Sequence, residues 1–226
     1  MNFFNKVRAI VWKDLTSEFR TREMLSSMLI FAFLTIIIFV FSFDPSKTLV
    51  KEVFPGIIWV SFIFSGILGL NRSFLNERSN DCLLGLMLCP VDRSAIFFGK
   101  MIGNFIFMVI MELISLPVFA ILFNYQIKFS DVGALVLIIF LGTLGFIASG
   151  TFLAALAANT RNSEILLPII LFPLIVPVVL GAVRATAAVL QGAPAADWLM
   201  WLKLMSAFDA IFLVVPLVLF EYVLEV

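Results

Sequence analysis

Long apolar stretches alternate with short charged segments along the whole chain. Each stretch has about the length that a helix needs to cross a hydrocarbon layer of roughly 30 Å, which is about 20 residues. In lipid the backbone has to satisfy its own hydrogen bonds, so each stretch is expected to be helical. Six such runs occupy residues 24–43, 53–70, 102–123, 132–159, 165–183 and 204–224. The pattern predicts an all-α integral membrane protein with six transmembrane helices, forming one transmembrane domain over residues 1–226.

A shorter amphipathic segment precedes the first run and predicts an interfacial helix over residues 1–23. Its apolar residues at helical spacing are Phe3, Phe4, Val7, Ile10, Val11 and Leu15. Its basic stripe, suited to anionic lipid headgroups, is Lys6, Lys13 and Arg20.

A polar row of Asp14, Glu18 and Arg22 crosses the apolar face of this segment. One interpretation is an ordinary solvated face with a Glu18–Arg22 ion pair at i,i+4 spacing. The other is a surface that docks a polar partner, with Lys13, Asp14 and Glu18 as contact residues. The sequence leaves both open.

The connection between the second and third runs combines clustered charge with a short apolar stretch at residues 82–89. The stretch is too short to span a membrane and predicts a short helix against the ends of the bundle. Pro90 ends it, Asp92 is placed to cap the next helix, and Lys100 marks the membrane edge. A hydrophobic turn would explain the apolar part but not the charges. We therefore favour a coupling helix that a soluble partner moves, with contacts from Glu77, Arg78, Asp81, Asp92 and Arg93.

The composition limits the partners and functional sites that can be expected. Hydrophobic residues make up 62% of the chain, the net charge is zero, and there is no histidine. Nucleic acid is therefore not an expected partner, and the commonest proton shuttle and metal ligand is missing. Cys82 and Cys89 lack the C-x-x-C spacing of metal or redox sites, so two buried apolar residues are the simpler interpretation. Gly99-Lys100-Met101 is not a phosphate-binding loop, so no catalytic, metal or nucleotide site is expected.

Basic residues are unevenly distributed between the two sides of the predicted bundle. Ten lie in the amino-terminal segment and the second-to-third and fourth-to-fifth connections, and five lie on the other side. The positive-inside rule then places both termini in the cytoplasm. Trp198 and Trp201, just before the sixth run, fit an outer interfacial belt.

Two runs carry residues that shape helices. Gly150, Ala154 and Ala158 stack at i,i+4 in the fourth run, which permits close approach of another helix. The fifth run is expected to be bent or broken, because each proline removes a backbone donor. These prolines are Pro168, Pro173 and Pro177.

Two acidic residues lie at membrane depth. Glu112 lies midway along the third run and Asp209 in the outer part of the sixth. An acid at membrane depth is a functional candidate, yet no Lys or Arg lies deep enough to pair with Glu112. A structural or interface role is favoured over a proton relay.

Several local sequences, taken in order, are similar to one family. They include Trp12-Lys13-Asp14-Leu15, Phe54-Pro55-Gly56-Ile57-Ile58-Trp59, Gly69-Leu70-Asn71-Arg72-Ser73-Phe74, Pro90-Val91-Asp92-Arg93, Ala157-Ala158-Asn159-Thr160-Arg161 and Phe208-Asp209. With these motifs the chain resembles the haem exporter protein B (CcmB) family of bacterial cytochrome c maturation over essentially its full length.

The resemblance implies an ABC-2-like permease subunit of the bacterial inner membrane, present in two copies. It implies an ATPase partner, CcmA, together with CcmC, CcmD and, indirectly, the haem chaperone CcmE. ATP would be hydrolysed on the partner, and haem would be handled by the complex without being bound here. The complex would use ATP hydrolysis to export haem or to release the haem-loaded chaperone. A non-transporting membrane scaffold is the alternative, and a proton-coupled carrier using Glu112 and Asp209 is a third possibility.

Overall fold

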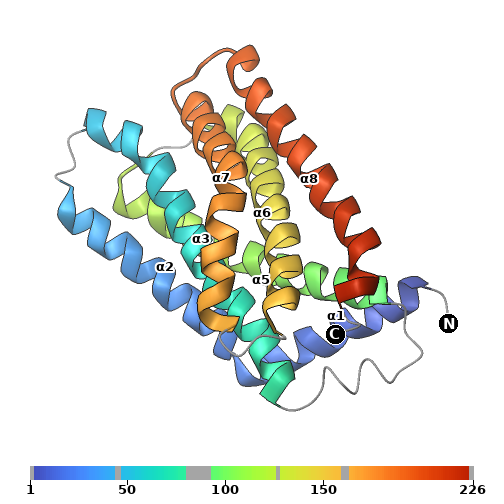
Figure 1. The fold of residues 1–226 in the computed structure, drawn as a ribbon. Coiled ribbons are helices and arrows are strands. Elements are labelled where there is room, and N and C mark those ends of the chain that lie inside the picture. Colours follow the sequence, from blue (N-terminus) through green and yellow to red (C-terminus); the bar gives the residue numbers. More distant parts are fainter. Residues whose placement is uncertain (1–2, 44–46, 80–92, 126–127, 159–162, 224–226) are drawn as a thin grey trace.

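The computed structural model describes residues 3–43, 47–79, 93–125, 128–158 and 163–223, which are helical almost throughout (Figure 1). The helices are α1 (Phe3–Thr21), α2 (Glu23–Ser42), α3 (Lys47–Ser79), α5 (Arg93–Leu122), α6 (Phe129–Ala158), α7 (Ser163–Leu190) and α8 (Ala195–Val223). In this part of the chain, six helices are long and apolar enough to cross a membrane. The predicted all-α architecture with six span-length helices is confirmed.

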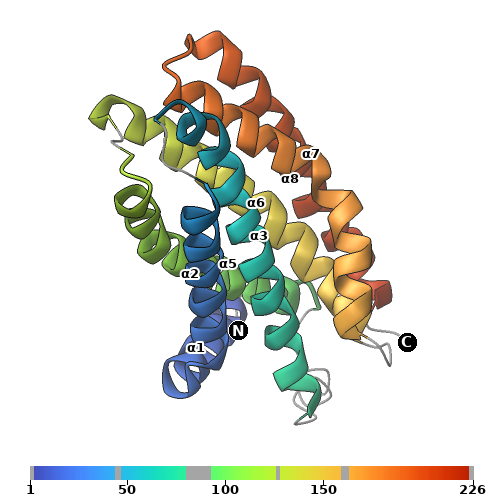
Figure 2. The ribbon, with the colours of Figure 1, turned by 90° about the vertical axis from the view of Figure 1, so that its left-hand side faces the viewer.

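The six long helices run alternately up and down, and α1 lies across one end of them (Figures 1 and 2). We call this end the α1 end. It also holds the last turns of α3, α6 and α8 and the first turns of α5 and α7. Helix α6 is central, since it packs against α3, α5, α7 and α8, whereas α2 packs on the outside against α3 and α5. Helix α1 packs mainly on α5.

Small residues of α6 let its neighbours approach closely. A side chain at Gly150 would meet Leu70 of α3, and Ala154 is buried, which confirms the close approach predicted for this stripe. At Gly142 a side chain would meet the ring of Trp59, also on α3. The Trp59 indole N–H donates to Thr186 Oγ1 at 3.1 Å, so one residue joins α3, α6 and α7.

Several helices extend beyond the apolar runs that predict them. Helix α8 begins at Ala195, ahead of the run at 204, so Trp198 and Trp201 lie inside it and Asp209 lies near its middle, not in an outer part. Helix α5 likewise begins at Arg93, ahead of the run at 102. Hydropathy detects only the part of a helix that suits lipid, whereas the backbone stays helical through flanking polar residues.

Helix α7 is continuous from Ser163 to Leu190 despite its three prolines, so the expected break is absent within this helix. Prolines are tolerated in membrane helices when surrounding groups satisfy the freed carbonyls.

At the end opposite α1, the Tyr125 hydroxyl donates a hydrogen bond to the Leu190 carbonyl oxygen at 3.1 Å. Burial, and to a lesser extent the Asp131 carboxylate, raise the pKa of Tyr125, which keeps this donor protonated.

Candidate functional site

A buried ion pair at the α1 end joins the first helix to the bundle. Lys100 of α5 places its Nζ 2.9 Å from Asp14 Oδ2, and the two side chains are only 4% and 14% exposed. Lys13 Nζ lies 3.2 Å from the other carboxylate oxygen, and its side chain is 46% exposed. A pair this deeply buried fixes relative position, because separating its members would leave a charge without compensation in a poorly solvated site.

A glycine of α5 makes this close contact of α1 possible. A Cβ atom at Gly99 would lie 2.7 Å from Ile10 Cγ2, whereas one at Gly103 would lie 3.7 Å from Asp14 Oδ2, which is an ordinary contact. Ile10 is itself buried, as is Val7 one turn earlier. Part of the apolar face of α1 and part of its polar row are therefore turned towards the bundle, whereas Phe4 is exposed.

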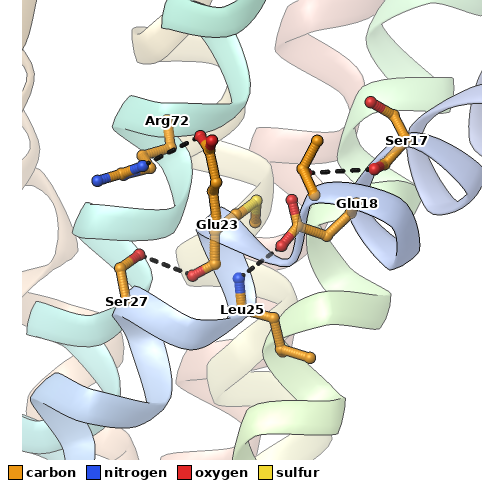
Figure 3. Close-up of polar contacts among 8 residues, drawn as sticks. Ser17, Glu18, Glu23, Leu25, Ser27 and Arg72 are labelled. Atoms are coloured by element: carbon orange, nitrogen blue, oxygen red, sulfur yellow. Dashed lines mark hydrogen bonds and ion pairs between the residues drawn. The ribbon is translucent and has the colours of Figure 1, made fainter.

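The corner between α1 and α2 is organised by Glu18 (Figure 3). Its carboxylate Oε1 accepts the Leu25 backbone N–H at 2.8 Å, so it satisfies one of the unpaired amides in the first turn of α2. Glu18 is buried, and the ion pair expected between Glu18 and Arg22 does not form between these two described residues. Arg22 instead forms the corner itself, with a left-handed backbone at φ 56° and ψ 17°.

A further contact connects this corner to the end of α3. Arg72 Nη1 lies 3.4 Å from Glu23 Oε2 in an exposed pair, which contributes about 0–1 kcal/mol (Figure 3). The contact adds little stability, but it links the corner to the helix that leads into the charged segment at residues 77–81, because Arg72 precedes that segment on α3. Polar contacts thus run from α5 through α1 and α2 to α3.

Of the predicted coupling residues, the structure describes only part. Asp81 and Asp92 lie outside the described residues, as does the short helix expected at 82–89. Glu77 and Arg78 lie in the last turns of α3 and Arg93 begins α5, while their side chains are outside the described part. The segment in question is therefore flanked by the two helices that Arg72 and Lys100 connect to the corner.

The two intramembrane acids lie on either side of α6. Thr143 Oγ1 is 2.6 Å from Glu112 Oε1, and Asn104 donates to Thr151 at 3.2 Å, so two polar contacts join α5 to α6. Glu112 Oε2 has no partner among the described residues, and neither carboxylate oxygen of Asp209 has one. Asp209 of α8 packs directly on Gly145.

Neither acid forms part of a metal-binding cluster, because the described residues contain no group of three acidic or cysteine side chains able to hold an ion.

Between residues 5 and 224 the sequence matches the family described as CcmB protein. The chain belongs to the CcmB family.

Known CcmB relatives align with most of this chain. A heme exporter protein B of Pseudomonas aeruginosa is 26% identical over 189 residues, which cover 84% of each chain. One from Escherichia coli K12 is 29% identical over 186 residues, covering 82% of this chain and 84% of the relative. One from Haemophilus influenzae is 26% identical over 173 residues, covering 76% and 77%.

The sequence did not identify the pairing partners within this CcmB protein. Asp14 and Glu18 were recognisable as polar residues on an apolar face, which is a signal that a helix buries charge. Lys100 is 86 positions from Asp14, and Glu18 binds a backbone amide, which no side-chain pattern reveals. The bundle-facing role of both acids leaves Lys13 as the more exposed member of the predicted second contact.

We expect the variant Glu112→Gln to fold and function within about twofold of the wild type. Glutamine has nearly the same shape, its Oε1 can still accept from Thr143, and a neutral amide loses less by burial than a carboxylate does. Assembly is measured by size-exclusion chromatography and function by cytochrome c maturation in cells. Full assembly with abolished maturation would contradict the structural role and favour a proton relay.

Proposed function

We propose that the chain is the membrane permease subunit of an ABC transporter complex for cytochrome c biogenesis. Membership in the CcmB family and relatives named heme exporter protein B support this function. The single structural observation that carries the coupling mechanism is the buried Asp14–Lys100 pair, which ties an end-lying helix to a membrane-crossing one. The subunit would couple ATP hydrolysis on a partner to haem export or to release of a haem-loaded chaperone.

The α1 end would face the cytoplasm of a bacterium, with the six helices in its inner membrane. Helix α1, the last turns of α3 and the first turns of α5, which carry most of the basic residues counted on this side, lie at this end of the fold. Both termini are then cytoplasmic. In this orientation α1 lies in the membrane interface, and Phe4, Trp12 and Phe19, which are 60–80% exposed, face lipid.

Motion would enter at the segment between α3 and α5. A push on residues 77–93 would act on the last turns of α3 and the first turns of α5, and the pairs at Arg72 and Lys100 would pass it to α2 and α1. Charged residues would contact the partner, as proposed for Glu77, Arg78, Asp81, Asp92 and Arg93. Lys13 would supply the second contact, because Asp14 and Glu18, the other residues predicted for it, face the bundle. Packed helices respond to such a push as units, because close-packed interfaces deform little.

The partners follow from the family. CcmA would hydrolyse ATP, CcmC and CcmD would complete the membrane complex, and CcmE would receive haem outside. Haem would be handled by the complex and not bound by this chain, which has no histidine to ligate it.

Charge reversal tests the coupling assignment. We expect the double variant Glu77→Lys, Asp81→Lys to lose most ATPase binding and cytochrome c maturation, since like charges would replace attractive contacts at the partner surface. The matched control reverses Glu52 and Asp197, two exposed acids at the opposite end. Co-purification of the ATPase and its activity are measured on both. Unchanged ATPase binding and maturation in the first variant would defeat the assignment.

A second experiment separates a moving permease from a scaffold. An ATPase-dead partner should still assemble with this chain but leave the loaded chaperone bound. If loaded chaperone were released as before, the chain would only hold the complex together.

A further inference from the structure

An apolar groove opens on the side of the bundle in the half remote from α1. Its volume is about 250 Å³. Four helices line it, with a buried floor on α3 and walls from α5, α6 and α7. The residues used below are Phe54, Ile58 and Trp59 on the floor, Leu113 and Val136 at the mouth, and Ala120 on the wall.

The mouth of the groove belongs to the lipid-facing surface. Leu113 and Val136 are 66% and 60% exposed, whereas Trp59 on the floor is only 3% exposed. The helices on both sides are long enough to span the membrane. The groove therefore opens sideways into hydrocarbon.

The lining offers no binding energy to a charged or polar ligand. None of the lining side chains is charged. The one hydroxyl, on Thr186, already donates to the Ala182 carbonyl at 2.7 Å and accepts from Trp59 at 3.1 Å. A haem propionate or a lipid headgroup would enter unpaired and lose its solvation. The chemistry of the lining suits an uncharged hydrocarbon.

The dimensions further limit the occupant. A cavity of about 150 Å³ is enough to bind benzene, and this groove is larger. An α-helix with its side chains is about 10–12 Å across, which is too thick for a space of this volume. A single extended chain of methylene groups fits.

We propose that this groove binds one acyl chain of a membrane phospholipid. The chain enters between α5 and α6 and lies against Phe54, Ile58 and Trp59. It fills space that would otherwise leave the lining without contacts, so the attraction comes from van der Waals packing between the acyl chain and the lining. The site is separate from the coupling contacts at the α1 end, and it stands whether or not the proposed transport function does.

Quenching of Trp59 fluorescence by brominated lipid tests the site. Bromine on an acyl chain quenches only an indole that it touches, and Trp59 is otherwise shielded by protein. A variant with the other three tryptophans changed to phenylalanine (Trp12→Phe, Trp198→Phe, Trp201→Phe) isolates the signal. In bilayers of phospholipid brominated along its acyl chain, we expect Trp59 emission to fall by about half relative to ordinary phospholipid, because bromine atoms in the groove would lie in van der Waals contact with the indole.

Filling the groove supplies the matched comparison. The added change Ala120→Phe should occupy the cavity and restore Trp59 emission, whereas Ala210→Phe, the same substitution at an exposed site on α8, should leave quenching intact. If the three-tryptophan change prevents purification, the difference between the wild type and Trp59→Phe reports the same side chain. Unquenched Trp59 in the folded protein, as a second copy covering the groove would produce, overturns the proposal. So does equal quenching in the Ala120→Phe variant.

Discussion

Replacing Lys100 with methionine is expected to lower the stability of the protein by about 3–5 kcal/mol, because a nearly buried carboxylate at Asp14 would lose its closest cation. For a chain of this size, that corresponds to a fall in thermal midpoint on the order of 10 °C. Cytochrome c maturation should fall with it, since α1 would no longer be held on α5. Thermal unfolding of the detergent-purified protein measures the first effect, and haem attachment to a reporter cytochrome measures the second.

Two comparisons make this prediction specific. Lys13→Met removes the more exposed partner of the same carboxylate and should cost at most about 1 kcal/mol. The double variant Asp14→Leu, Lys100→Met should recover most of the lost stability, because an apolar pair can replace a buried ion pair. A double variant as unstable as Lys100→Met would mean that Asp14 is not the contact that matters.

Substitution of Gly142 is the second change expected to have a large effect. An alanine there would place its Cβ against the ring of Trp59, which is itself held by Thr186. Overpacking of this kind typically costs about 1–3 kcal/mol, and Gly142→Leu should prevent folding. Thermal stability in detergent and the yield of monodisperse protein provide the measurements.

Gly133 is the matched control on the same helix. A Cβ at Gly133 meets nothing within 4 Å, so Gly133→Ala should gain up to about 1 kcal/mol from helix propensity alone. A smaller ring in Gly142→Ala, Trp59→Phe should recover part of the loss. The prediction would be wrong if Gly142→Ala were as stable as Gly133→Ala.

The membrane-crossing helices were predictable because a backbone in hydrocarbon has to satisfy its own hydrogen bonds. Six runs of sufficient length and apolarity had to be helical, and over the described residues each run lies in one helix apart from at most one residue at its end. The helix ends were not predictable to the same degree. Trp198 and Lys203 both lie within α8, although the predicted apolar run begins only at residue 204. Outside the hydrocarbon, local propensity and capping decide where a helix begins.

Only part of the candidate site could be predicted from the sequence. The position of Asp14 and Glu18 on the apolar face followed from helical spacing. The partners of these two acids could not be predicted, because Lys100 comes from a helix far along the chain and the Leu25 backbone amide has no side-chain pattern that marks it. The same limit applied to Trp59, whose ring is placed by Gly142 and Thr186 from two other helices.

The backbone at Arg22 has a mechanical consequence. A glycine at this corner would swivel freely, but a residue with a Cβ atom is confined to a narrow left-handed region, and the Glu18 carboxylate closes the corner from inside. Helix α1 and helix α2 therefore turn as one bent rod. Helix α2 is about 30 Å long, so rocking α1 by roughly 5° would swing the far end of α2 by about 2–3 Å. A small displacement at the α1 end would thus reach the far end of α2 enlarged.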